Sequence, residues 1–226
     1  GIKRAAARAG VKIVTADTKV VEKGKGDQIF INTSGLGLIH PNAKIHHNRI
    51  IPGDQIVLSG NLANHGIAIM SKRQGLEFET TLESDTTALN YTIHNLLDTF
   101  GEEIHFLRDP TRGGLASVLN EVAELTQLGY HIDQKLIPLD EQVEGACEML
   151  GLDPLYVANE GLFLAVVNPD ISEEFLALLR ADENGTNASV IGEASTEHPG
   201  KVLLKSRIGG RRVVNYLTGE QLPRIC

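Results

Sequence analysis

Apolar residues recur along this chain in two spacings, which together predict a mixture of helices and strands. Spacing typical of an amphipathic helix marks residues 1–10, 61–75, 85–100, 113–129, 141–151 and 172–180. Short apolar or alternating runs predict strands within residues 11–21, 28–39, 51–60, 103–110, 131–134, 161–167, 189–194 and 201–205. The two kinds of element mix without strict strand–helix–strand alternation, and this favours an α+β fold over a doubly wound sheet.

Breaks in the pattern predict three parts. His40, Pro41 and Asn42 interrupt the apolar runs, so we expect a boundary after residue 40, with residues 1–40 left over from an N-terminal domain whose beginning is missing. Residues 41–208 then form an α+β domain. Residues 209–226 are punctuated by Gly and Pro and have few apolar residues after Val214, which predicts a flexible tail.

Composition narrows the possible partners. The formal net charge is −8, which argues against nonspecific binding to nucleic acid or to an anionic membrane. No apolar run is long enough to cross a bilayer.

The two cysteines have different settings. Cys147 lies in a helical stretch, where a small buried apolar residue is the expected role. Cys226 is the last residue; we expect it to be exposed, with Arg224 favouring its thiolate, so it is the candidate nucleophile. The alternative is a frayed end that carries no chemistry.

Three further motifs admit both a chemical and a structural interpretation. Asp17, Thr18 and Lys19, in TADTKVV, offer groups for magnesium and phosphate, or form a solvated turn. RDPTRGGLA, at 108–116, is either an anion-receiving loop or a helix start capped by Thr111. Glu160 precedes a buried strand and is either a base or a turn residue. The histidines at 46, 47 and 65 form no metal-ligand pattern with a cysteine and are interpreted as loop residues.

Several motifs in this order resemble those of the HypE proteins of the aminoimidazole ribonucleotide synthetase-like superfamily. They are TADTKVV, FINTSGLG, PGDQIVLSG, NHG, RDPTRGGLA, NEG and the terminal PRIC, and they extend over nearly the whole chain. PRIC is the motif that separates HypE from the rest of the superfamily. Leu162 departs from the lysine that many relatives have there, but Glu160 is kept. The resemblance implies a two-domain architecture of the synthetase type, with the first domain incomplete.

The resemblance also implies a function, in maturation of [NiFe]-hydrogenases. The carbamoyltransferase HypF would load Cys226 with a carboxamide, and ATP with Mg²⁺ would drive its dehydration to a thiocyanate. The cyanide would then pass to iron on a HypC–HypD complex. The protein would be a cytoplasmic homodimer when complete.

By the same resemblance, Glu160 would be the general base and Lys19 would polarise the carboxamide oxygen. Asp17 would contact magnesium, while Thr18 and Asn32 would serve the nucleotide. The alternative for a chain without its N-terminal part is a carbamoyl carrier or partner-binding module that has no catalytic activity.

Overall fold

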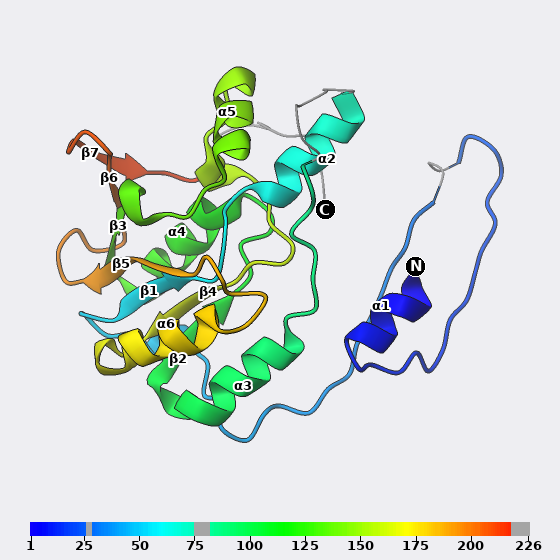
Figure 1. Ribbon diagram of the computed structural model, residues 1–226, viewed down its shortest axis with the longest axis horizontal. Helices are drawn as coiled ribbons and strands as arrows, with labels where there is room; N and C mark the ends of the chain where they lie inside the picture. Colours follow the sequence, from blue (N-terminus) through cyan, green and yellow to red (C-terminus); the bar gives the residue numbers. More distant parts are fainter. Residues whose placement is uncertain (26–28, 75–81, 218–226) are drawn as a thin grey trace.

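The computed structural model places most of the chain around one β-sheet with helices on both faces (Figure 1). It describes residues 1–25, 29–74 and 82–217. The strands are β1 (Gln55–Leu58), β2 (Ile104–Arg108), β3 (Gly129–Asp133), β4 (Leu164–Val167), β5 (Ser189–Ser195), β6 (Val202–Lys205) and β7 (Arg211–Val214). The α-helices are α1 (Ile2–Arg8), α2 (Asn64–Gln74), α3 (Asn90–Phe100), α4 (Gly114–Thr126), α5 (Glu141–Leu150) and α6 (Ser172–Arg180). Short 3-10 helices cover His47–Arg49, Gly101–Glu103, Gln134–Leu136, Pro154–Tyr156 and Pro169–Ile171.

The sheet has seven strands in the order β2-β4-β1-β5-β3-β6-β7. Neighbouring strands are antiparallel except β3 and β6, which are parallel. Antiparallel pairs with a single parallel crossover are typical of an α+β fold, so the predicted fold class is confirmed.

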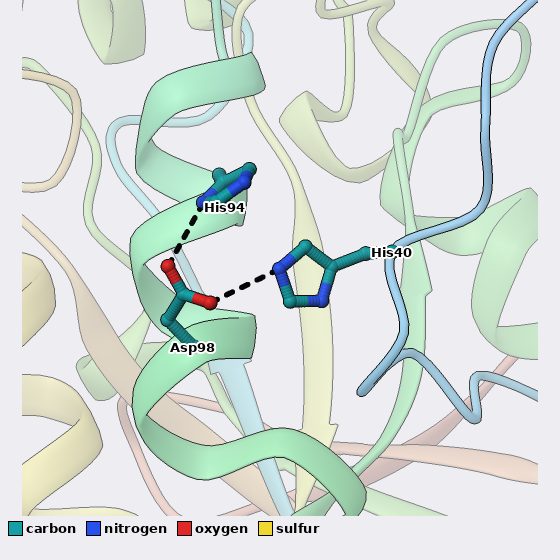
Figure 2. A group of neighbouring side chains, drawn as sticks. All are labelled: His40, His94 and Asp98. Atoms are coloured by element: carbon teal, nitrogen blue, oxygen red, sulfur yellow. Dashed lines mark hydrogen bonds and ion pairs between the residues drawn. The ribbon is translucent and has the colours of Figure 1, made fainter.

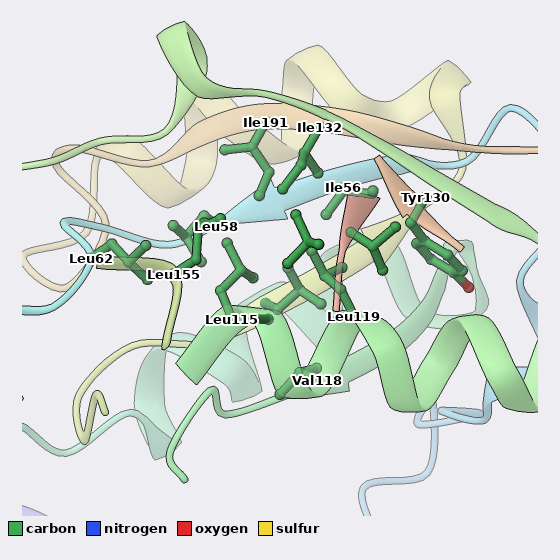
Figure 3. Close-up of a cluster of buried hydrophobic side chains, with 14 of the residues drawn as sticks. Ile56, Leu58, Leu62, Leu115, Val118, Leu119, Tyr130, Ile132, Leu155 and Ile191 are labelled. Carbon is green, nitrogen blue, oxygen red and sulfur yellow. The ribbon is translucent and has the colours of Figure 1, made fainter. Parts of the chain in front are cut away.

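Alternating side chains of the central strands build a separate core on each face of the sheet. Ile56 and Leu58 of β1 join the cluster beneath α4, where Leu115 and Leu119 pack against them (Figure 3). Val57, between them, belongs to the second cluster, which α3 and α6 cover on the opposite face. A strand that is buried on both faces has no polar position to mark its period, which is why β1 and β4 are continuous apolar runs in the sequence.

The N-terminal segment differs from its prediction. The helix expected at residues 1–10 is confirmed as α1, but the strands expected between residues 11 and 39 are not formed, since the described part of this stretch has no strand residue. Every described residue from Val11 to Ile39 is exposed, and the segment loops away from the sheet (Figure 1). A strand needs a neighbouring backbone to bond with, and the described chain places none beside this segment.

Polar contacts at both ends of this segment fasten it to α3. Near its start, the Asn90 side-chain amide donates to the carbonyl of Ala9 at 3.0 Å. At its end, His40 Nε2 forms a hydrogen bond with Asp98 at 3.1 Å, and His94 Nδ1 forms an ion-pair contact with Asp98 at 3.0 Å (Figure 2). The predicted domain boundary after residue 40 therefore lies next to the His40–Asp98 contact. The boundary itself stays a prediction.

The remaining elements agree with the sequence except at two places. Helix α3 begins at Asn90, five residues after the predicted start, and residues 82–89 form no regular secondary structure. Strand β7 lies inside the predicted tail and pairs with β6 from Arg211 to Val214. The prediction of a tail from residue 209 is thus wrong for residues 211–214, and residues 218–226 lie outside the described part of the chain.

Candidate functional site

One buried side chain joins three of the sequence motifs. Asn159 of NEG is fully buried, and its Oδ1 accepts the Ala63 N–H, just before NHG, at 2.7 Å. Its amide group donates to the carbonyls of Pro110, in RDPTRGGLA, at 2.9 Å and of Val157 at 3.0 Å. Asn159 thereby holds two loops, which lie 49 and 96 residues before it in the sequence, against the turn of NEG.

The two glycines of RDPTRGGLA allow this close packing. Gly113 and Gly114 both have positive φ, of 69° and 60°, and a Cβ on Gly114 would lie 2.5 Å from the Leu155 carbonyl oxygen. Only glycine avoids both the strain and the clash. Helix α4 begins at Gly114 without a side-chain cap, so the predicted cap by Thr111 is not formed.

Asp85 fixes the backbone of Glu160. The Glu160 N–H points between the two carboxylate oxygens of Asp85, at 3.1 and 3.2 Å, and the neighbouring Gly161 N–H also donates to this carboxylate. A Cβ on Gly161 would lie only 1.7 Å from the Asp85 carbonyl oxygen, which explains the glycine of NEG. Glu160 itself is half-buried, so its carboxylate lies at the edge of the fold on a backbone that is held from two sides.

Burial raises the pKa of Asp85 above its ordinary value, while the N–H donors from Glu160 and Gly161 and the nearby His65 oppose the shift. His65 Nδ1 lies 2.8 Å from the Ser84 hydroxyl and 3.9 Å from Asp85. The prediction that His65 is a loop residue is wrong, because it lies buried in the first turn of α2. Its Nε2 is buried without a hydrogen-bond partner among the described residues, as is Oδ1 of Asn64.

The residues predicted to serve the nucleotide lie elsewhere. Asp17, Thr18, Lys19 and Asn32 are all exposed on the N-terminal segment, and the Thr18 N–H donates to Asp17 Oδ1 at 2.8 Å. No described hydrogen bond or ion pair connects them with Glu160. The structure therefore brings Glu160, Asp85 and His65 together but does not add the Asp17–Lys19 turn to that group.

The two cysteines differ as far as the structure describes them. Cys147 lies on the buried face of α5, and burial raises the pKa of its thiol to about 11. A thiol with so high a pKa is almost entirely protonated at neutral pH and is a poor nucleophile. Cys226 lies outside the described residues.

Asp85 and His65 were not identified as site residues from the sequence. Asp85 stands in a stretch that the apolar spacing assigns to a helix, and its partner Glu160 is 75 residues away. A carboxylate at this distance in the sequence carries no local signal of the contact. The fully buried Asp54 of PGDQIVLSG, by contrast, has a structural role, since it pairs with His105 at 2.7 Å.

Comparison with known proteins identifies the family of the chain. The family described as AIR synthase related protein, C-terminal domain, matches residues 52–205. Carbamoyl dehydratase HypE of Bradyrhizobium diazoefficiens is 46% identical over 222 residues, which cover 98% of this chain and 64% of that protein. The HypE of Cupriavidus necator is 47% identical, with 63% of its length covered. The chain thus spans about 64% of the length of these relatives.

Two solved structures are similar over nearly the whole chain. A HypE structure in complex with ATP has a TM-score of 0.93 at 43% identity and is matched over 99% of this chain and 68% of its own. HypE in a HypE–HypF complex has a TM-score of 0.91 at 42% identity, with 96% of this chain and 70% of that chain covered. By its family match and by these structures, the chain belongs to the AIR synthase-related family and, within it, to the HypE proteins.

Proposed function

We propose that this chain acts in an ATP-dependent carbamoyl dehydratase, which converts a carboxamide on the Cys226 sulfur into a thiocyanate during maturation of [NiFe]-hydrogenases. Family membership supports the general activity, since the similar proteins are named carbamoyl dehydratases. The observation that carries the assignment to residues is the turn at Glu160, whose N–H is held by both oxygens of Asp85.

The proposed reaction conserves every atom. The S-carboxamide gives up its oxygen and two N–H protons, and its C–N bond becomes the triple bond of the thiocyanate. ATP transfers its γ-phosphoryl group to this oxygen and leaves as ADP, and the oxygen then departs as phosphate, because an amide oxygen is otherwise a poor leaving group. What the protein must provide is a base at the nitrogen and cations near the developing phosphate.

Glu160 is proposed as that base. A general base has to stay within hydrogen-bond reach of the proton that it removes, which requires a fixed backbone. The contacts from Asp85 to Glu160 and from Asn159 to Ala63 and Pro110 supply this rigidity on both sides of the carboxylate. Half-burial leaves the carboxylate open to a substrate carried on an approaching tail.

Lys19 is proposed to polarise the carboxamide oxygen, and Asp17 to contact the Mg²⁺ that accompanies ATP. The donor set fits this role, because a carboxylate, the Thr18 hydroxyl and an ammonium group lie within three residues on an exposed turn. Mg²⁺ usually keeps several waters and takes one or two carboxylates, so the single carboxylate of Asp17 is sufficient for one contact. Asn32 is proposed on the nucleotide side.

The proposed partners are the HypF carbamoyltransferase and a HypC–HypD complex. A HypE from this family has been crystallised with HypF, which supports the first. A homodimer is proposed because the N-terminal segment exposes many apolar side chains, including Val20, Phe30 and Leu36. We place the protein in the cytoplasm. In the part of the chain that the structure describes, no helix has the length and apolar character needed to cross a membrane.

A second candidate function is a carbamoyl carrier without dehydratase activity. It is favoured by the exposure of Asp17, Thr18 and Asn32, which form no enclosed nucleotide site in the described chain. Binding of ATP to the 226-residue chain, measured by calorimetry, distinguishes the two. Saturable binding supports the dehydratase, and its absence supports the carrier for this length of chain.

Loading of the tail provides the direct test of the nucleophile. The protein is incubated with HypF, ATP and carbamoyl phosphate and then analysed by mass spectrometry. Cys226→Ala should abolish the carboxamide adduct, and Cys147→Ala should leave it intact, because Cys147 is buried and protonated. An adduct mapped to Cys147 would remove Cys226 from the proposal.

A further inference from the structure

Two histidines and a glutamate meet where β3 is joined by the loop between β5 and β6. His131 lies on β3, and Glu197 and His198 lie on the loop at residues 196–201. One ligand atom from each residue lies within 4.8 Å of the others. We infer that this group, called here the His131 cluster, binds a divalent transition-metal ion such as Zn²⁺.

The two imidazoles already have the separation that one ion requires. His131 Nε2 and His198 Nδ1 face each other at 3.3 Å. Two nitrogens bound to one tetrahedral Zn²⁺, each at about 2.0–2.1 Å, would lie roughly 3.3 Å apart. Binding of an ion requires a lone pair on both nitrogens, which neutral histidines supply once each carries its proton on the other ring nitrogen. The two rings then have to rotate so that both lone pairs point to the ion.

The elements that carry the ligands are rigid. His131 is paired on both sides, with β5 and with β6. The loop is held against β3 by two hydrogen bonds, from the Tyr130 N–H to the Lys201 carbonyl at 2.9 Å and from the Gly200 N–H to the Leu128 carbonyl at 3.0 Å. A Cβ on Gly129 would lie 1.8 Å from the Glu197 carbonyl oxygen, so glycine is required for this approach.

His198 has a left-handed backbone conformation. Its φ is 56°, in a region that few residues other than Gly adopt and in which Asn, Asp and His are enriched. This conformation turns the imidazole back toward β3, where it meets His131. The left-handed backbone at residue 198 thus accompanies the meeting of the two imidazoles.

Carboxylates complete the ligand set. The Glu197 carboxylate has no hydrogen-bond or ion-pair partner among residues 1–25, 29–74 and 82–217, so it is available to a cation. Glu193 lies directly opposite His131 in the β3–β5 pairing and adds negative charge on the same face of the sheet.

A second histidine group, His40, His94 and Asp98, has the same ligand types but a different hydrogen-bond state (Figure 2). Both histidines already contact Asp98. The His40 Nδ1 accepts the Asn42 N–H at 3.3 Å, which leaves the proton on Nε2, the nitrogen that faces Asp98. An ion there would have to displace the His40–Asp98 hydrogen bond and compete with the His94–Asp98 contact, and this group therefore serves as the matched control.

Zn²⁺ titration by calorimetry tests the inference, with every protein carrying Cys226→Ser so that the terminal thiol cannot bind the ion. The reference protein should bind one Zn²⁺ at the His131 cluster. His131→Gln and His198→Asn should each weaken that binding about tenfold or more, since even loss of groups outside the ligand set costs this much. Asparagine tolerates the left-handed conformation at position 198, so the loop should keep its shape. His94→Gln should change nothing.

Three results would overturn the inference: no Zn²⁺ binding by the reference protein, unchanged binding in His131→Gln or His198→Asn, or loss of binding in His94→Gln alone. Thermal unfolding of each variant without metal checks that it is folded. A variant that binds weakly because it is unfolded would show no cooperative thermal unfolding transition. Glu197→Gln, on the exposed loop, then takes the place of that variant and should also weaken Zn²⁺ binding.

Discussion

Substitution of Asn159 by alanine should destabilise the protein through one main defect. Asn159 Oδ1 is the acceptor for the buried Ala63 N–H, at 2.7 Å, and alanine leaves this N–H without a partner. The Pro110 carbonyl keeps a donor, because it also accepts the backbone N–H of residue 159 at 3.2 Å. The Val157 carbonyl loses the side-chain amide that lies 3.0 Å away.

The magnitude follows from these contacts. An orphaned buried donor costs about 1–3 kcal/mol, and a lost ordinary hydrogen bond costs about 1 kcal/mol. The free energy of unfolding should therefore fall by about 2–4 kcal/mol. With a urea dependence of about 2 kcal/mol per molar, in the middle of the usual range, the unfolding midpoint should fall by roughly 1–2 M.

Urea unfolding followed by circular dichroism measures this change. Asn48→Ala is the matched control, since Asn48 is exposed, and should alter the free energy of unfolding by less than about 0.5 kcal/mol. If Asn159→Ala behaved like Asn48→Ala, the hydrogen bonds of Asn159 would not hold the three loops together, and the proposed rigidity of Glu160 would lose its basis.

Two further outcomes follow from shifted pKa values. Burial raises the pKa of Cys147 to about 11, whereas the pKa of an ordinary thiol is about 8.5. Iodoacetamide at about pH 8 should therefore alkylate Cys147 in the folded protein several hundredfold more slowly than an ordinary thiol, and the difference should disappear when urea unfolds the chain. Rapid labelling of the folded protein would contradict this burial. Because the pKa of Asp85 is raised in the folded state, folding favours its protonated form, and the stability it contributes is lost as pH rises above 3.8. Asp85→Asn does not ionise and still accepts the Glu160 N–H, so its stability relative to the parent should increase from about pH 4 to pH 7, and a flat or falling difference would refute the stated cause.

Sequence periodicity was sufficient for most elements of the sheet domain. The stretch at 113–129 became α4 and that at 172–180 became α6, because one apolar face of each packs on the sheet. Periodicity did not predict β7. This strand begins with Arg211 and Arg212 and pairs only with β6, so most of its positions stay exposed. An edge strand of this kind has no apolar pattern to reveal it.

The strands predicted between residues 11 and 39 failed for the opposite reason. Their apolar pattern is clear, with Ile13, Val20 and Phe30 all exposed, but β structure also requires a partner backbone. The local sequence shows whether a segment is able to form a β-strand. Whether the strand forms depends on a second strand lying beside it.

At the candidate site, sequence motifs identified the loops but not the contacts between them. RDPTRGGLA, NHG and NEG were each identified in the sequence, and the hydrogen bonds of Asn159 hold their loops together in the fold. The Asp85–Glu160 contact could not be inferred, since no periodicity relates residues 75 positions apart. The assignment of Lys19 and Glu160 to one reaction stays a prediction.

The central claim, that Glu160 is the base of the dehydration, is tested most directly in the full-length protein by Glu160→Gln. Glutamine keeps the size of the side chain but takes no proton at neutral pH. Loading of Cys226 by HypF should be normal, because it needs only an accessible thiolate. Loss of a general base typically slows a reaction about a hundredfold to ten-thousandfold.

The measurement is a mass-spectrometric time course after loading, in which the thiocyanate appears as an adduct lighter than the carboxamide by one water. Glu174→Gln, at an exposed position on α6, is the control and should convert at the parent rate. We predict that Glu160→Gln accumulates the carboxamide and forms thiocyanate at least about a hundredfold more slowly. Conversion at the parent rate in Glu160→Gln would contradict the assignment and leave Glu160 as a turn residue only.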